Sequence, residues 1–234
     1  MIEWELRIAG PLIALAGLGS GILGARDAAA DRDAGDAARV DWAAGRVVAG
    51  GTGIADRHAP SPAVALGTSR RSAEDAARRR IAVKLGSLPL AQGGTVADRL
   101  GDAQVKARID AAVDAALPVA ADPETDGSWH VTLAVPLEAI RLALAAPRAL
   151  PPGGDRGPEV VVVDGVAARP AIGWTIAGIA AATLWVDAVP VWAKDAPRVT
   201  ARSARAGAIE TDAASGTAAT LYLVVEAGRA RPGR

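Results

Sequence analysis

A run of proline and glycine beyond the middle of the chain sets the strongest limit on what the chain can fold into. Residues 151–158 read PPGGDRGP. Proline lacks a backbone N–H and fixes φ, and glycine favours turns, so this run predicts neither a helix nor a strand. It therefore predicts a linker or a domain boundary between two segments that each form their own secondary structure.

The segment before this run predicts helices together with antiparallel strands. A strand is expected at 40–49, and a hairpin is expected from strands at 119–122 and 129–135 around the turn 123–127. Apolar and polar residues alternate in the second hairpin strand, which puts His130 on its outer face. Helices are expected where apolar residues recur at helical spacing: from Ser72, with Asp75 forming a capping box, to Leu88; through Val105, Ile109 and Val113; and after Pro136.

The segment after the run is predicted to be rich in strands. Strands are expected at 159–164, 182–186, 189–193 and 220–225, with no regular alternation of strand and helix. The predicted class is α+β, with helices packed on a small antiparallel sheet and a second, β-rich unit after it. The expected divisions are 1–30 as a signal peptide or anchor, 31–39 as a linker, 40–147 as the α+β domain, 148–157 as the Pro/Gly linker, 158–228 as the β-rich unit and 229–234 as a tail.

The first thirty residues contain an apolar stretch without charge, Ile8–Ala25. With Ala28–Ala30 as a small-residue cleavage site, it predicts a secretory signal peptide and export. An uncleaved anchor and a core helix remain alternatives, because the stretch is at the short limit for a membrane span and is rich in glycine.

The composition excludes several kinds of chemistry. The chain has 26 basic and 26 acidic residues, two His and no Cys. A balanced charge argues against a nucleic-acid binder, and the absence of Cys excludes disulfides, thiol nucleophiles and cysteine-bound metals. No catalytic residue, cofactor or metal ligand is predicted; Asp102, Asp110 and Asp114 are spread along a helix without a partnered His.

Two further motifs have both a structural and a functional interpretation. Gly50–Gly53 follows a strand but lacks the third glycine of a dinucleotide fingerprint, and the two prolines after it do not predict a helix, so a flexible glycine turn is favoured over a phosphate loop. Arg70, Arg71 and Arg78–Arg80 predict a solvated helix face, with a phosphate or anionic-lipid patch as the alternative.

Several weak motifs, in chain order, carry a family resemblance. They are Trp42 and Gly45 with Val47–Gly53, the Ala/Arg-rich helix from Ser72 to Leu85, Asp126–Val131 followed by Val135–Leu137, Val161–Asp164, Arg169–Ala171 and Trp192–Asp195. Together they resemble the LPP-twenty lipoprotein family, whose domain is similar to the N-terminal domain of the flagellar outer-membrane assembly protein FlgT. This sequence lacks the lipobox cysteine of that family, because Leu18 stands in its place.

The resemblance implies a non-enzymatic protein of the periplasm or cell envelope, often at the outer membrane, that acts as a structural or assembly module. Its expected partners are envelope or outer-membrane proteins or further copies of itself, with membrane association through the N-terminus, and an exposed edge is expected on the Trp129 strand. One alternative is a hydrolase using Asp126 and Asp164, which requires the two carboxylates to converge within about 5–10 Å. The other is an anion-binding envelope protein using Arg70, Arg71 and Arg78.

Overall fold

A computed structural model describes residues 37–145, 159–212 and 221–226, which all belong to one unit, Ala34–Arg234. The predicted signal peptide or anchor, the Pro/Gly linker and the C-terminal tail lie outside the described residues. Within the described ranges, no helix combines the length and the apolar character that crossing a membrane requires.

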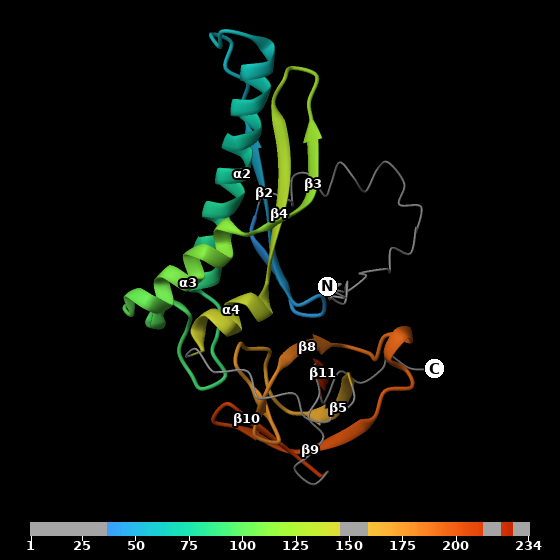
Figure 1. Cartoon of the computed structure of the whole chain (residues 1–234). Coiled ribbons are helices and arrows are strands. Elements are labelled where there is room, and N and C mark those ends of the chain that lie inside the picture. The colour runs from blue at the N-terminus through green and yellow to red at the C-terminus, as the bar shows by residue number, and fades with distance from the viewer. Residues whose placement is uncertain (1–36, 146–158, 213–220, 227–234) are drawn as a thin grey trace, which may run out of the picture. The chain divides into compact units, whose positions relative to one another are not determined.

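The first sheet has four antiparallel strands (Figure 1). They are β1 (Arg39–Asp41), β2 (Arg46–Gly53), β3 (Leu117–Pro123) and β4 (Trp129–Pro136), in the spatial order β1-β2-β4-β3. The predicted hairpin is confirmed as β3 and β4, which pair antiparallel with Ala121 opposite Val131. Val131, Leu133 and Val135 are buried on one face of β4, as their alternation predicted.

Three α-helices occur among the described residues: α2 (Pro62–Gly86), α3 (Ala103–Asp114) and α4 (Leu137–Leu144). A short 3₁₀ helix, η1 (Ala97–Arg99), lies between α2 and α3. Helix α2 runs along the four-stranded sheet (Figure 1), and its buried side chains share one core with β2 and β4. Ala73, Ala77, Ile81 and Leu85 form the buried stripe of α2, as the helical spacing predicted.

The start of α2 differs from the prediction. The capping box at Ser72 is wrong, because α2 begins at Pro62 and Ser72 lies exposed inside the helix. Ser61 is the N-cap, and its hydroxyl accepts a hydrogen bond from the N–H of Val64 at 3.3 Å. Proline suits the first helical position because its fixed φ is helical and the missing N–H has no acceptor there.

The glycines of Gly50–Gly53 lie within β2 and not in a turn, so the expectation of a flexible glycine turn is wrong. Gly51 and Gly53 face α2 at very short range. A Cβ at Gly51 would lie 2.1 Å from the carbonyl oxygen of Ala73, and one at Gly53 would lie 1.8 Å from that of Ser69. Because backbone meets backbone here, glycine is what lets the helix approach the sheet this closely.

The second sheet has seven strands in the spatial order β7-β6-β10-β9-β5-β11-β8. The pairs β5–β11, β11–β8, β5–β9 and β10–β6 are parallel, a pairing that the strand patterns of this unit did not predict. The strands are β5 (Val160–Val166), β6 (Thr175–Ile176), β7 (Ile179–Ala180), β8 (Ala182–Val186), β9 (Arg198–Arg205), β10 (Ala208–Thr211) and β11 (Leu221–Glu226). The protein is therefore α+β, with helices on a small antiparallel sheet and a β-rich second part.

The predicted strand at 189–193 is also wrong. Pro190 precedes a 3₁₀ helix, η2 (Val191–Ala193), in the loop between β8 and β9. Strands β9 and β10 were missed, since apart from Val199 and Ile209 they consist of alanine and polar residues. Such a composition has a weak strand signal.

Backbone hydrogen bonds connect the part of the chain that holds the first sheet to the part that holds the second. The N–H of Ile172 donates to Pro89 O and its carbonyl accepts from Ala91, both at 2.9 Å. The N–H of Trp185 in β8 donates to Trp42 O at 3.1 Å. Ile172 is 5 % exposed and belongs to the core that α2 forms with the first sheet. These bonds and this burial are the reason that both sheets belong to one unit.

Candidate functional site

The two carboxylates of the hydrolase hypothesis have separate surroundings. Asp126 lies in the turn between β3 and β4, where it accepts hydrogen bonds from the hydroxyl and the N–H of Ser128. The Ser128 hydroxyl, helped by the backbone N–H, lowers the pKa of Asp126. Asp164 lies in β5 of the other sheet, and its carboxylate pairs with Arg198 at 3.3 Å. Each acid thus has a local structural role, and they share no partner.

Asp102 and Asp110 of helix α3 likewise bind groups of their own helix. Asp102 is the N-cap of α3 and accepts hydrogen bonds from the N–H groups of Val105 and Gln104. These backbone donors, Val105 first, lower the pKa of Asp102. Asp110 pairs with Lys106 on the exposed side of the helix. In the part of the chain that the structure describes, no three His, Cys, Asp or Glu side chains form a group that could hold a metal ion.

The arginines of the anion-binding hypothesis are mostly neutralised. Glu74 pairs with Arg70 at 3.2 Å and with Arg78 at 3.6 Å, and Asp75 pairs with Arg78 at 3.1 Å. Arg70 also lies over the ring of Trp129, 5.2 Å from its centroid. Arg70 and Arg78 therefore stabilise the helix surface and do not form an open cationic patch with Arg71.

His130 has a partner that its sequence neighbourhood does not show. Thr52, 78 residues away, places its hydroxyl 3.3 Å from Nδ1 of His130, and Asp122 lies opposite His130 on the next strand. A hydroxyl beside an imidazole is the pairing of a nucleophile and its base. Here, however, Thr52 and Asp122 are exposed on an open sheet face, so we interpret the contact as a cross-strand hydrogen bond between β2 and β4.

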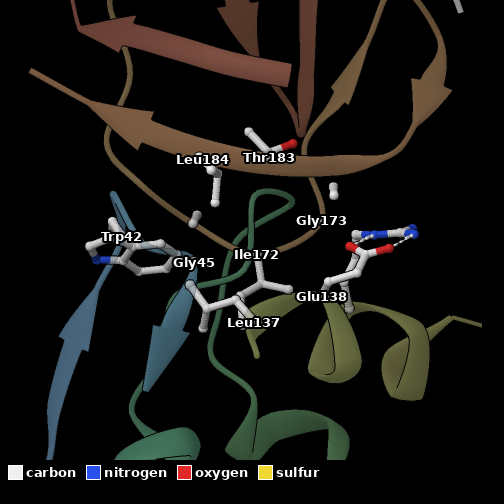
Figure 2. A pocket seen from close by; sticks show the side chains of 11 residues that line it. Trp42, Gly45, Leu137, Glu138, Ile172, Gly173, Thr183 and Leu184 are labelled. Carbon is white, nitrogen blue, oxygen red and sulfur yellow. Dashed lines mark hydrogen bonds and ion pairs between the residues drawn. The ribbon is translucent and has the colours of Figure 1, made fainter. Parts of the chain in front are cut away.

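A small pocket lies where residues of the two sheets meet (Figure 2). Its volume is about 50 Å³, which is enough for a few water molecules but not for an organic substrate. Trp42, Leu137, Ile172 and Leu184 point toward it from different elements (Figure 2). Gly45 adopts φ +63°, and a Cβ there would lie 2.4 Å from Cδ2 of Leu184. The close packing makes this pocket part of the connection between the sheets.

One ion pair lines the same pocket. Glu138 accepts two hydrogen bonds from Arg141, at 2.7 and 2.6 Å (Figure 2). The Glu138 carboxylate raises the pKa of Arg141, whose side chain is 18 % exposed. Both residues belong to α4 and each satisfies the charge of the other, so the pair stabilises the helix and leaves neither group for a substrate.

The most unusual surface is formed by Pro190–Ala193, which we call the Trp192 turn. Val191 is 84 % exposed and its neighbour Trp192 is 63 % exposed. Trp42, Trp129, Trp174 and Trp185, the other tryptophans that the structure describes, are all buried or half-buried. In a chain without Phe and with one Tyr, an exposed indole beside an exposed valine is a pair of apolar side chains that a partner protein can cover.

Backbone hydrogen bonds and the buried side chain of Ala193 fix the conformation of the Trp192 turn. The N–H of Ala193 donates to Pro190 O at 2.9 Å, and that of Lys194 donates to Val191 O at 3.3 Å. Ala193 is 3 % exposed and packs in a cluster with Val162 and Leu223 of the central strands. An exposed aromatic residue on a fixed backbone loses little entropy when it binds, as the anchor residues of protein interfaces do.

The expected exposed edge lies on a different strand. The Trp129 strand, β4, pairs with β2 on one side and β3 on the other, so the prediction of an edge there is wrong. The edge strands are β1 and β3, and in β3 Leu117 is 57 % and Val119 is 50 % exposed. Pro118 and Pro123 lie in β3 and lack the N–H that a further strand would need, which is a common protection of sheet edges.

The Trp192 turn was missed because its apolar residues were assigned to a strand, where Trp192 would have been packed against a sheet. Pro190 was the available signal, since proline interrupts strands. The sequence matches no protein-family model, and no curated protein is significantly similar to it. The function must therefore be inferred from the residues of the chain itself.

Proposed function

We propose that this protein is a non-enzymatic cell-envelope protein that acts as an assembly module through protein–protein contacts. The observation that carries the proposal is the exposed pair Val191 and Trp192 on the Trp192 turn. Tryptophan is the residue most enriched among the anchors of protein interfaces, where it fills a pocket of the partner and excludes water. The partners are other envelope proteins or further copies of this chain.

The chemistry of the other candidate residues supports a binding role. Asp126, Asp164, Asp102 and Arg70 each satisfy a neighbouring group of the fold. The envelope location follows from the apolar stretch Ile8–Ala25 together with the resemblance to the LPP-twenty family, and is part of the same proposal.

Native complex size tests the assembly role. We expect the wild-type chain in a gentle cell extract to migrate in a complex larger than one chain, and Trp192→Ser to shift it to the size of the single chain. Arg205→Ser is the matched control, because Arg205 is also exposed on the second sheet but is not apolar. If Trp192→Ser and Arg205→Ser leave the same large complex, or if the wild type is a single chain in the extract, the Trp192 turn is not an assembly surface.

The location has its own test. The intact mass of the protein from fractionated cells should correspond to a chain starting at Asp31 in the periplasmic fraction, or to the full chain in the membrane fraction. A full-length mass in the cytosol would contradict the envelope location without bearing on the Trp192 turn.

A further inference from the structure

A groove runs beside the C-terminal half of α2. Its volume is about 530 Å³, and Ala37 and Ala38 line it from the segment before β1. From α2 it is lined by Arg79, Arg80, Val83 and Lys84. A volume of this size falls within the range of small-molecule sites, about 300–1,000 Å³.

Among the described residues, the charged side chains that line the groove are all cationic: Arg79, Arg80 and Lys84. No carboxylate of the described ranges pairs with Arg79 or Lys84; Glu74 and Asp75, one turn before Arg79, are bound to Arg70 and Arg78. Arg80 donates to the carbonyl oxygen of Gly50 at 2.7 Å, which fixes its guanidinium between α2 and β2. Arg79 and Lys84 therefore present positive charge toward which an anionic group is drawn.

The rest of the lining is apolar. Val83, one turn after Arg79, is 80 % exposed, and the two alanines face it from the other side. A free inorganic anion would leave Val83 in water, whereas a ligand with an apolar chain would cover it and gain the hydrophobic free energy of its burial. The pattern of cations beside an exposed valine matches a molecule with a charged head and an apolar body.

We propose that this groove binds a monomeric anionic amphiphile, an alkyl chain that ends in a carboxylate or phosphate group. Arg79 and Lys84 bind the oxyanion by charge-assisted hydrogen bonds, and Val83 packs on the alkyl chain. This site is separate from the Trp192 turn, which lies in the loop between β8 and β9, and its test is independent of the assembly role.

The test is a titration of dodecyl phosphate and of laurate, both below their micelle concentrations, into the full chain, with dissociation constants from calorimetry. We expect saturable binding that weakens with salt. Arg79→Gln and Lys84→Gln should each raise the dissociation constant about tenfold, corresponding to about 1.4 kcal/mol. Val83→Ser should likewise raise the dissociation constant of the amphiphile. Arg71→Gln and Lys106→Gln are matched controls, since both residues are exposed cations outside the groove.

Three results would overturn the proposal. The first is binding that Arg79→Gln and Lys84→Gln leave unchanged while circular dichroism shows the variants folded, which would indicate adsorption elsewhere. The second is inorganic phosphate binding as tightly as dodecyl phosphate, which would leave Val83 without a role. The third is binding to vesicles of an anionic phospholipid but not to the monomeric amphiphiles, which would make the groove a membrane-contact surface.

Discussion

Two glycines of β2, which have no side-chain carbon, determine how close α2 lies to its sheet. Gly51 and Gly53 alternate along β2 and face the backbone of α2, where even a Cβ has no room. The sequence shows these glycines as a motif, but their spacing alone predicts a turn or a phosphate loop. Only the helix that returns over the strand shows that they serve packing, because the required space depends on a partner some twenty residues away.

Gly51→Ala should destabilise the protein by about 1–3 kcal/mol, since the added methyl group forces α2 away from β2. Gly67→Ala is the control: Gly67 lies in α2 with nothing within 4 Å of a Cβ, so alanine should be neutral or stabilise the helix by about 0.5–1 kcal/mol. Urea unfolding measures both. Equal stabilities of the two variants would show that Gly51 does not lie against α2.

Asp102 predicts a dependence of stability on pH. Its pKa is lowered from the ordinary value of 3.8 by the N–H groups of Val105 and Gln104. A lowered pKa means that the carboxylate stabilises the fold above pH 3.8, and that this contribution is lost as the pH falls through the lower pKa of the folded state. Asp102→Ala should therefore be less stable than wild type at neutral pH.

The difference between Asp102→Ala and wild type should shrink as the solution is acidified below the folded-state pKa. Asp102→Asn should keep most of the cap at every pH, because an amide oxygen also accepts the backbone hydrogen bonds. Thermal unfolding across the acid range measures the effect. A difference between wild type and Asp102→Ala that stays constant into strong acid would mean that the Asp102 carboxylate does not cap α3.

At the scale of elements, the local sequence pattern predicted the helices and the hairpin of the first part of the chain. It did not predict where the helices begin or how the strands of the second sheet pair. Apolar spacing found α2, α3 and the β3–β4 hairpin. The capping box at Ser72 was misleading because helix-favouring alanines continue on both sides of it, and because Pro62 opens the helix and does not interrupt it. Parallel pairing of β5 with β11 could not be predicted, since a strand pattern does not name its partner.

The two candidate caps of α2 can be separated by mutation. Ser61→Ala removes the acceptor for the Val64 N–H and should cost about 0.5–2 kcal/mol. Ser72→Ala should change stability by less than about 0.5 kcal/mol, because its side chain is exposed inside the helix. Chemical denaturation measures the free energy of unfolding of the two variants and so shows which serine caps α2. A larger loss for Ser72→Ala than for Ser61→Ala would place the start of the helix at the predicted capping box.

A hydrogen bond from the buried face of α2 gives a second check on the same element. The hydroxyl of Ser69, which is 1 % exposed, lies 2.9 Å from Gly127 O and 3.0 Å from Leu66 O. Ser69→Ala leaves the turn carbonyl without this donor and should cost about 1–3 kcal/mol. Hydrogen exchange should rise at residues 124–128 in this variant. Unchanged stability and exchange would mean that Ser69 does not hold the hairpin turn.

At the scale of the whole molecule, the sheets depend on each other through Ile172. Ile172→Ala should destabilise the fold by about 2–5 kcal/mol. The loss should appear at the same denaturant concentration in the far-ultraviolet signal of the helices and in the fluorescence of Trp174 and Trp185, whose ring centroids lie 6.2 Å apart. A fluorescence transition that stays at the wild-type position would show that the second sheet unfolds independently.

Cross-linking at the Trp192 turn in intact cells tests the proposed assembly role most directly. A photoreactive amino acid at position 192 should, after illumination of intact cells, join this chain to one defined protein, identified by mass spectrometry as an envelope protein or a second copy. The same group at position 205 should join it to none. A chain that cross-links at neither position, or equally at both, would contradict the proposal that the protein acts through a contact at Trp192.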